Sequence, residues 1–130
     1  MKIFNTLSGK KEIFEPIEDN KIRMYVCGMT VYDDTHIGHA RTFLSFDLIV
    51  RYLRSIDYEV QYIRNITDVD DKIIARSEEL NISPSELTND CINSMHDDFK
   101  ALGMISPDAE PRATENIDSI VSLITILIDK

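Results

Sequence analysis

The chain has 130 residues, 43% of them hydrophobic and 28% charged, with only four Gly and four Pro, which is typical of one soluble globular unit. No apolar run reaches the roughly 18 residues of a membrane span, and the N-terminus lacks the apolar stretch of a signal peptide, so the cytoplasm is the expected compartment. The formal net charge of −9 repels phosphates, so the chain alone is expected to bind nucleic acid poorly. Two cysteines, Cys27 and Cys91, are too few for a disulfide framework and are expected to be reduced.

The first half of the chain predicts strands around one long helix. Residues 2–17 alternate about a polar Ser-Gly-Lys-Lys turn, as a hairpin does, and residues 21–28 form a strand that ends at Gly28. Residues 58–66 are rich in β-branched and aromatic side chains and predict the next strand. Between these strands, residues 37–56 predict a helix because apolar residues recur at helical spacing. These residues are Phe43, Leu44, Leu48, Val50, Tyr52 and Leu53.

Helices are expected in the second half. One opens in the segment 67–80, with Thr67 or Asp68 as its cap and two further aspartates in its first turn. Another begins at Ser83, a capping residue that Pro84 follows.

The last segment, residues 114–130, is apolar at helical spacing and ends without a Gly or Pro stop. This pattern favours a chain from which residues have been cut away, with a natural terminus as the alternative.

The order strand, helix, strand, helix predicts an α/β fold in which a parallel sheet carries crossover helices on its faces. Ligands of such sheets bind at the carboxyl ends of the strands. Residues 27–39 and 65–71 follow the two predicted strands. Their polar side chains are therefore expected to lie where this fold places its chemistry.

Two histidines open the predicted long helix. His36 and His39 are three residues apart and so project from one side of its first turn, and Gly38 between them carries no side chain. Two hydrogen-bond donors, a helix N-terminus and room for a flat ring would suit a nucleoside triphosphate. The alternative is a pair of ordinary polar residues at a helix start, and the spacing alone does not decide between the two.

Residues 36–39 spell the HIGH motif of class I aminoacyl-tRNA synthetases, and with YVCG, TVYDD, YIRNITDVDDKI and DAEPRAT around it the chain resembles cysteinyl-tRNA synthetases. The similarity runs from Lys2 to the end, although Met29 stands where the family often has Pro. The resemblance implies a Rossmann-like nucleotide-binding fold, with its N-terminal half in residues 1–112. Residues 113–130 would begin a connecting insertion.

The resemblance also implies the reaction. ATP and L-cysteine would form cysteinyl-adenylate and pyrophosphate, and the cysteinyl group would pass to tRNA(Cys) for protein synthesis. His36 and His39 would bind ATP and stabilise charge on the α-phosphate, and Gly38 would pack against adenine. The residues expected in the amino-acid pocket are Gly28, Thr30 and Thr67.

The family's first zinc ligand corresponds to Cys27, and the metal would bind the thiolate of substrate cysteine, a ligand that Zn²⁺ prefers to a hydroxyl. The other ligands, a Cys, a His and a Glu, would lie outside this chain. Without the resemblance an isolated cysteine is a small buried hydrophobe, and we keep that interpretation for Cys91. The family further implies Mg²⁺ with ATP, and a monomer.

The remaining polar groups are interpreted as structural. The aspartates in residues 68–71 are typical of helix capping, although a magnesium site is the alternative. His96 is expected on a helix surface, with a role near the substrate as the alternative, and Arg112 is expected to fix its loop by hydrogen bonds.

The family's Lys-Met-Ser-Lys-Ser loop, the second half of its nucleotide-binding fold and its anticodon-binding domain have no counterpart in the sequence. We therefore expect an N-terminal part of a cysteinyl-tRNA synthetase that is inactive by itself. The alternative is a stand-alone synthetase-like module that binds a nucleotide or a partner without catalysis.

Overall fold

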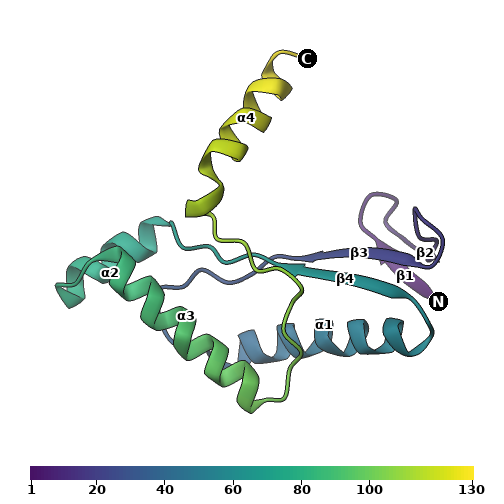
Figure 1. Ribbon diagram of the computed structural model, residues 1–130, viewed down its shortest axis with the longest axis horizontal. Coiled ribbons are helices and arrows are strands. Elements are labelled where there is room, and N and C mark those ends of the chain that lie inside the picture. The colour runs from purple at the N-terminus through teal and green to yellow at the C-terminus, as the bar shows by residue number, and fades with distance from the viewer.

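A computed structural model of residues 1–130 contains a small hairpin, a parallel strand pair and four α-helices (Figure 1). No helix combines the length and the apolar character needed to cross a membrane. In chain order the elements are β1 (Lys2–Asn5), β2 (Lys10–Ile13), β3 (Lys21–Val26), α1 (Ile37–Ser55), β4 (Glu59–Arg64), α2 (Asp71–Leu80), α3 (Pro84–Ala101), the 3₁₀ turn η1 (Thr114–Asn116) and α4 (Ile117–Ile128).

The predicted hairpin is confirmed. β1 and β2 pair antiparallel, with Lys2 opposite Ile13 and Asn5 opposite Lys10. The turn occupies residues 6–9 and so lies slightly before its predicted place. It ends at Gly9, whose φ of 67° is a conformation that glycine adopts without strain.

The predicted βαβ unit is also confirmed. β3 and β4 are parallel, with Lys21 opposite Glu59 and Val26 opposite Arg64, and α1 lies along one face of the pair (Figure 1). Helices were expected on the faces of the sheet, but only this face is covered, and the strands accordingly alternate buried and exposed residues. This pair and its helix are a mixed α/β arrangement and do not amount to a complete doubly wound fold.

The outer edge of β4 is covered by the segment 108–113, which runs beside it. The backbone N–H groups of Arg64 and Ile66 donate to the carbonyl oxygens of Ala109 and Pro111, at 3.2 and 2.9 Å. The outer edge of β3 has no strand partner. The strand pair is therefore closed on one side and open on the other.

The apolar stripe of α1 is narrower than predicted. Asp47 lies buried within it and accepts a hydrogen bond from the Ile105 backbone N–H at 2.7 Å, which ties α1 to the chain after α3. The buried stripe of α1 is narrow because the sheet that it covers has only two strands. The predicted residues that are buried are Phe43, Val50 and Leu53, whereas Leu44, Leu48 and Tyr52 are exposed.

The start of α2 was predicted wrongly. The helix is capped by Asp70, whose Oδ1 accepts a hydrogen bond from the Lys72 backbone N–H at 2.9 Å, and neither Thr67 nor Asp68 caps it. The carboxylate of Asp68 instead accepts hydrogen bonds from the backbone N–H and the hydroxyl of Thr114, at 3.0 and 2.6 Å. Local sequence rules assign Asp68 to a helix cap, but its carboxylate instead binds Thr114, a residue distant in the sequence.

The later helices follow their predictions more closely. Ser83 caps α3 and accepts a hydrogen bond from the Glu86 backbone N–H at 3.1 Å, with Pro84 at the first position. The predicted last helix forms as η1 and α4. α4 points away from the rest of the molecule (Figure 1), and none of its residues is buried.

A buried ion pair joins the elements on the covered face of the sheet. The Arg64 guanidinium lies against the rings of both Phe43 and Phe99, at 5.1 and 4.8 Å from their centroids. Its Nε and Nη2 donate to Glu110 Oε1 at 2.9 and 2.5 Å, and Glu110 Oε2 lies 2.5 Å from His96 Nε2. One carboxylate therefore connects β4 and α3 with the 108–113 segment.

We expect Glu110→Ala to lower the free energy of unfolding by roughly 3–5 kcal/mol, because it leaves the Arg64 charge buried without its partner. Urea denaturation followed by circular dichroism measures this loss. The control is Glu79→Ala, which removes the exposed ion pair to Arg76 (3.0 Å) and should cost less than about 1 kcal/mol. Equal losses in the two variants would contradict a structural role for the buried pair.

Candidate functional site

The loops that follow β3 and β4 run side by side beyond the ends of the strands. The Val31 N–H donates to the Thr67 carbonyl at 3.1 Å, and the Thr67 N–H donates to the Met29 carbonyl at 3.2 Å. Thr30 and Thr67 thereby form an isolated parallel bridge. This ladder brings the first turns of α1 and α2 to the same end of the sheet.

Gly28 is a point of close approach between these two loops. Its N–H donates to the side-chain oxygen of Asn65 at 2.7 Å. A Cβ atom at residue 28 would lie 1.6 Å from the Asn65 carbonyl oxygen, so no other residue fits without a backbone shift. The position of Cys27, immediately before this contact, is therefore set by the neighbouring loop.

The two histidines cap α1 reciprocally. His36 Nδ1 accepts a hydrogen bond from the Gly38 N–H at 3.1 Å, and His39 Nδ1 accepts one from the His36 N–H at 3.3 Å. Their rings stack with centroids 3.8 Å apart. Since both Nδ1 atoms act as acceptors, this pattern assigns the proton of each neutral ring to Nε2. Each imidazole then keeps one N–H donor for a ligand.

Gly38 makes this cap possible. A Cβ atom at residue 38 would lie 2.8 and 2.9 Å from two atoms of the His36 ring. The missing side chain of Gly38 thus leaves room for the His36 imidazole in this structure. A larger residue would push that ring out of its capping position.

His39 is half-buried, and its pKa lies below the ordinary value of 6.5. Burial is the larger cause, since it disfavours the charged ring, and the nearby His36 acts in the same direction. The neutral ring inferred from the hydrogen bonds is therefore also the form that its surroundings favour.

A cavity of about 300 Å³ lies at this end of the sheet, and we call it the α1 cavity. Four of the predicted site residues line it together: Cys27, Gly28, Thr30 and His39. His36 and Gly38 lie beside it in the first turn of α1, and Thr67 contacts the backbone of Thr30 without lining the cavity. The other lining residues are Met29, Tyr32, Thr42, Phe43 and Lys72.

The two cysteines have different surroundings. Cys27 is exposed at the cavity wall, and its Sγ contacts the Gly28 carbonyl at 3.6 Å. The chain contains no group of three or more His, Cys, Asp or Glu residues arranged to hold a metal ion, so Cys27 could bind Zn²⁺ only together with ligands from outside these residues. Cys91 is buried, as predicted, and burial together with the charge of Asp34 raises its pKa.

Lys72 is the charged cavity residue that sequence reasoning missed. It lies in the first turn of α2, and its Nζ is 5.5 Å from the centroid of the Tyr32 ring. A cation at a helix N-terminus opposes the helix dipole. That mismatch is visible in the sequence and could have singled out this residue.

Two other polar residues have structural partners. Arg112 donates from Nη1 to the Asn89 side-chain oxygen at 2.9 Å, which agrees with its predicted role in fixing a loop. His96 is on the surface of α3, as predicted, and its hydrogen bond to Glu110 adds a structural contact that the sequence did not indicate.

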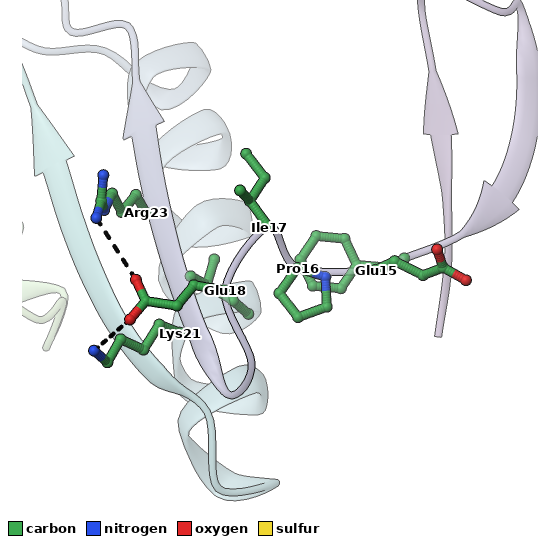
Figure 2. A pocket seen from close by; sticks show the side chains of 8 residues that line it. Glu15, Pro16, Ile17, Glu18, Lys21 and Arg23 are labelled. Atoms are coloured by element: carbon green, nitrogen blue, oxygen red, sulfur yellow. Dashed lines mark hydrogen bonds and ion pairs between the residues drawn. The ribbon is translucent and has the colours of Figure 1, made fainter.

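A second cavity, of about 330 Å³, lies between the hairpin and β3 (Figure 2), and no histidine lines it. Within it, Glu18 pairs with Lys21 at 2.5 Å and with Arg23 at 3.7 Å. Because these charges neutralise one another, the α1 cavity is the better candidate for an anionic ligand.

Known proteins match almost the entire chain. Residues 13–130 match the family of tRNA synthetases class I (C) catalytic domains. The chain is 57% identical over 130 residues to a cysteine–tRNA ligase of Marinomonas sp. (strain MWYL1) and 56% identical over 129 residues to one of Coxiella burnetii (strain Dugway 5J108-111). A cysteine–tRNA ligase of Pasteurella multocida (strain Pm70) is 56% identical over 128 residues. The matches cover 98–100% of this chain and 28% of each relative.

The lowered pKa of His39 predicts a loss of stability in acid. Below about pH 6.5 the unfolded chain takes up a proton at this residue more readily than the folded chain, so the free energy of unfolding falls until the lower folded pKa is passed. We expect a midpoint below 6.5 in an NMR titration of His39. His39→Asn should lose less stability than the wild type between pH 7.5 and 5.5, and equal acid sensitivity would contradict the assignment.

Proposed function

The chain belongs to the family of class I (C) tRNA synthetase catalytic domains, and from this premise we propose that it supplies part of the active site of a cysteine–tRNA ligase. In the proposed reaction a carboxylate oxygen of L-cysteine attacks the α-phosphorus of ATP, and the bond to pyrophosphate breaks. The cysteinyl group of the adenylate then passes to tRNA(Cys). The chain spans 28% of the length of its relatives, so the activity of the whole ligase belongs to this proposal.

The phosphate side of the site would be built by the first turn of α1. His36 and His39 would each donate Nε2–H to phosphate oxygens of ATP, which enters with Mg²⁺. Donors that are already oriented stabilise the charge that develops on the α-phosphate. The neutral tautomers and the stacked rings support this role, because the capping bonds hold both imidazoles in place. Gly38 would pack against adenine.

The amino-acid side would lie along the loops after β3 and β4, with Gly28, Thr30 and Thr67 as pocket residues. Cys27 would be one of four ligands of a Zn²⁺ ion, and its exposure at the cavity wall supports this role. The other three ligands would come from residues outside this chain. When bound, the metal would supply an affinity for thiolate that distinguishes cysteine from serine.

For the architecture, we propose that residues 1–112 form the N-terminal half of a Rossmann-like nucleotide-binding domain and that residues 113–130 begin a connecting region. The parallel β3–α1–β4 unit and its open strand edge support the first assignment. The exposed apolar helix α4 supports the second. The complete ligase is proposed to act as a cytoplasmic monomer that also binds tRNA(Cys).

A single observation carries the proposal. Cys27 and His39, which belong to two separate motifs, line one cavity at the carboxyl ends of two parallel strands. This is the place at which an open parallel sheet binds its ligands. A small amino acid held at the first residue would present its carboxylate to a nucleotide held at the second.

The 130-residue chain alone is expected to give no detectable cysteine-dependent ATP–pyrophosphate exchange, because catalysis requires its groups to be present together. A full-length relative whose matching residues are replaced by this chain should catalyse the exchange. In that chimera His39→Ala should lower kcat by about 10²-fold or more. A chimera that binds ATP but gives no exchange would favour a binding module over the ligase.

We expect Cys27→Ser in the same chimera to lose Zn²⁺ and cysteine activation while ATP binding is kept, because a neutral hydroxyl replaces a charged thiolate ligand. Metal analysis and the discrimination of cysteine against serine measure the effect. The control is Cys91→Ser, which changes a buried thiol and should keep Zn²⁺ while losing roughly 1 kcal/mol of stability. Full zinc occupancy in Cys27→Ser would reject the ligand role.

A further inference from the structure

The α1 cavity has one lining side chain with a permanent positive charge, Lys72. His36 and His39 each accept a hydrogen bond at Nδ1, so each imidazole has its Nε2 position left for a ligand. The chain as a whole carries a net charge of −9. Lys72 is therefore the one lysine or arginine side chain that an anion entering this cavity meets.

Local structure does not account for a lysine at this place. Residue 72 lies in the first turn of α2, where the helix dipole favours negative charge, and Asp70 already caps that turn. Lys72 forms no ion pair, although Asp70 and Asp71 precede it directly. Its only charge-related contact is the Tyr32 ring, and such contacts contribute about 0.5–1 kcal/mol when exposed. The ammonium donors thus remain available to a ligand.

Hydrogen bonds between two loops place Lys72 at the cavity. The loops after β3 and β4 are joined by the hydrogen bonds between Val31 and Thr67 and between Thr67 and Met29, and α2 begins just beyond them. Tyr32 lies on the neighbouring loop, and its ring lies beneath the lysine ammonium. Lys72 from α2 and His39 from α1 therefore line the same cavity.

We propose that Lys72 binds an anionic oxygen of the substrates at the point where ATP and the amino acid meet. This inference rests on the proposed function, and it adds a residue to that site. The shared chemistry is an oxyanion, which belongs either to the α-phosphate of ATP or to the carboxylate of the amino acid. A lysine ammonium suits either group as a compact point charge with three donors.

The test compares Lys72→Met, which keeps the stem and removes the charge, with Lys72→Arg, which keeps the charge. The control is Lys100→Met, an equal charge change at an exposed lysine of α3 that forms no ion pair. All three are placed in the chimera described above. The measurements are ATP–pyrophosphate exchange with ATP and L-cysteine varied separately, ATP binding by calorimetry, and the unfolding curve.

We expect Lys72→Met to lower kcat/KM roughly 10- to 100-fold, as the loss of a charged hydrogen bond does, with an unchanged unfolding curve. Lys72→Arg should recover part of this loss, and Lys100→Met should remain within about twofold of the parent. A raised KM for L-cysteine alone assigns the oxyanion to the carboxylate. A lower kcat or weaker ATP binding assigns it to the phosphate.

Kinetic constants within twofold of the parent in Lys72→Met would overturn the proposal, as would equal losses in the Met and Arg variants with a shifted unfolding curve. These outcomes leave the ligase function standing if the parent catalyses exchange. If the parent binds ATP without exchange, the ligase function fails, and ATP affinity still decides the role of Lys72. Weaker ATP binding in Lys72→Met then supports it, and unchanged ATP binding overturns it.

Discussion

The charged side chain of Arg64 is one of only 21 buried residues among the 130 of the chain. Glu110, which lies 46 residues later in the sequence, neutralises its charge. Burying an ion costs several kcal/mol unless its partner is in place, so β4 is stable only when the 108–113 segment lies beside it. The rings of Phe43 and Phe99 hold the guanidinium from α1 and α3. The packing of β4, the 108–113 segment, α1 and α3 thus depends on the Glu110 carboxylate. This dependence favours cooperative folding.

The same arrangement supports the α1 cavity, because Phe43 both contacts Arg64 and lines the cavity wall. Sequence motifs predicted Cys27 and His39 in the site, and the structure brings them to one cavity. The motifs predicted these residues correctly because Cys27 directly follows the end of β3 and His39 lies in the first turn of α1. Lys72 was not predicted: its mismatch with the helix dipole is visible in the sequence, but its place in the cavity depends on hydrogen bonds between two loops.

The fold shows the same division between local and distant causes. The hairpin, the long helix and the Ser83 cap follow from nearby residues, and they were predicted correctly. The cap of α2 was assigned wrongly because Thr114, far along the chain, takes the carboxylate of Asp68. Leu48 belongs to the apolar pattern that predicted α1, but it is exposed, because the sheet that α1 covers is only two strands wide. Periodicity gives the direction of an apolar face, whereas its width depends on what packs against it.

The open edge of β3 bears on how this molecule behaves in concentrated solution. An unpaired strand edge presents backbone donors and acceptors to any neighbouring chain, and such edges nucleate aggregation. In β3, Lys21 and Arg23 place two positive charges on a six-residue strand. Charged side chains, and lysine above all, discourage edge-to-edge pairing between identical strands. Lys21 and Arg23, although both paired with Glu18, therefore disfavour pairing of this edge with another copy of the strand.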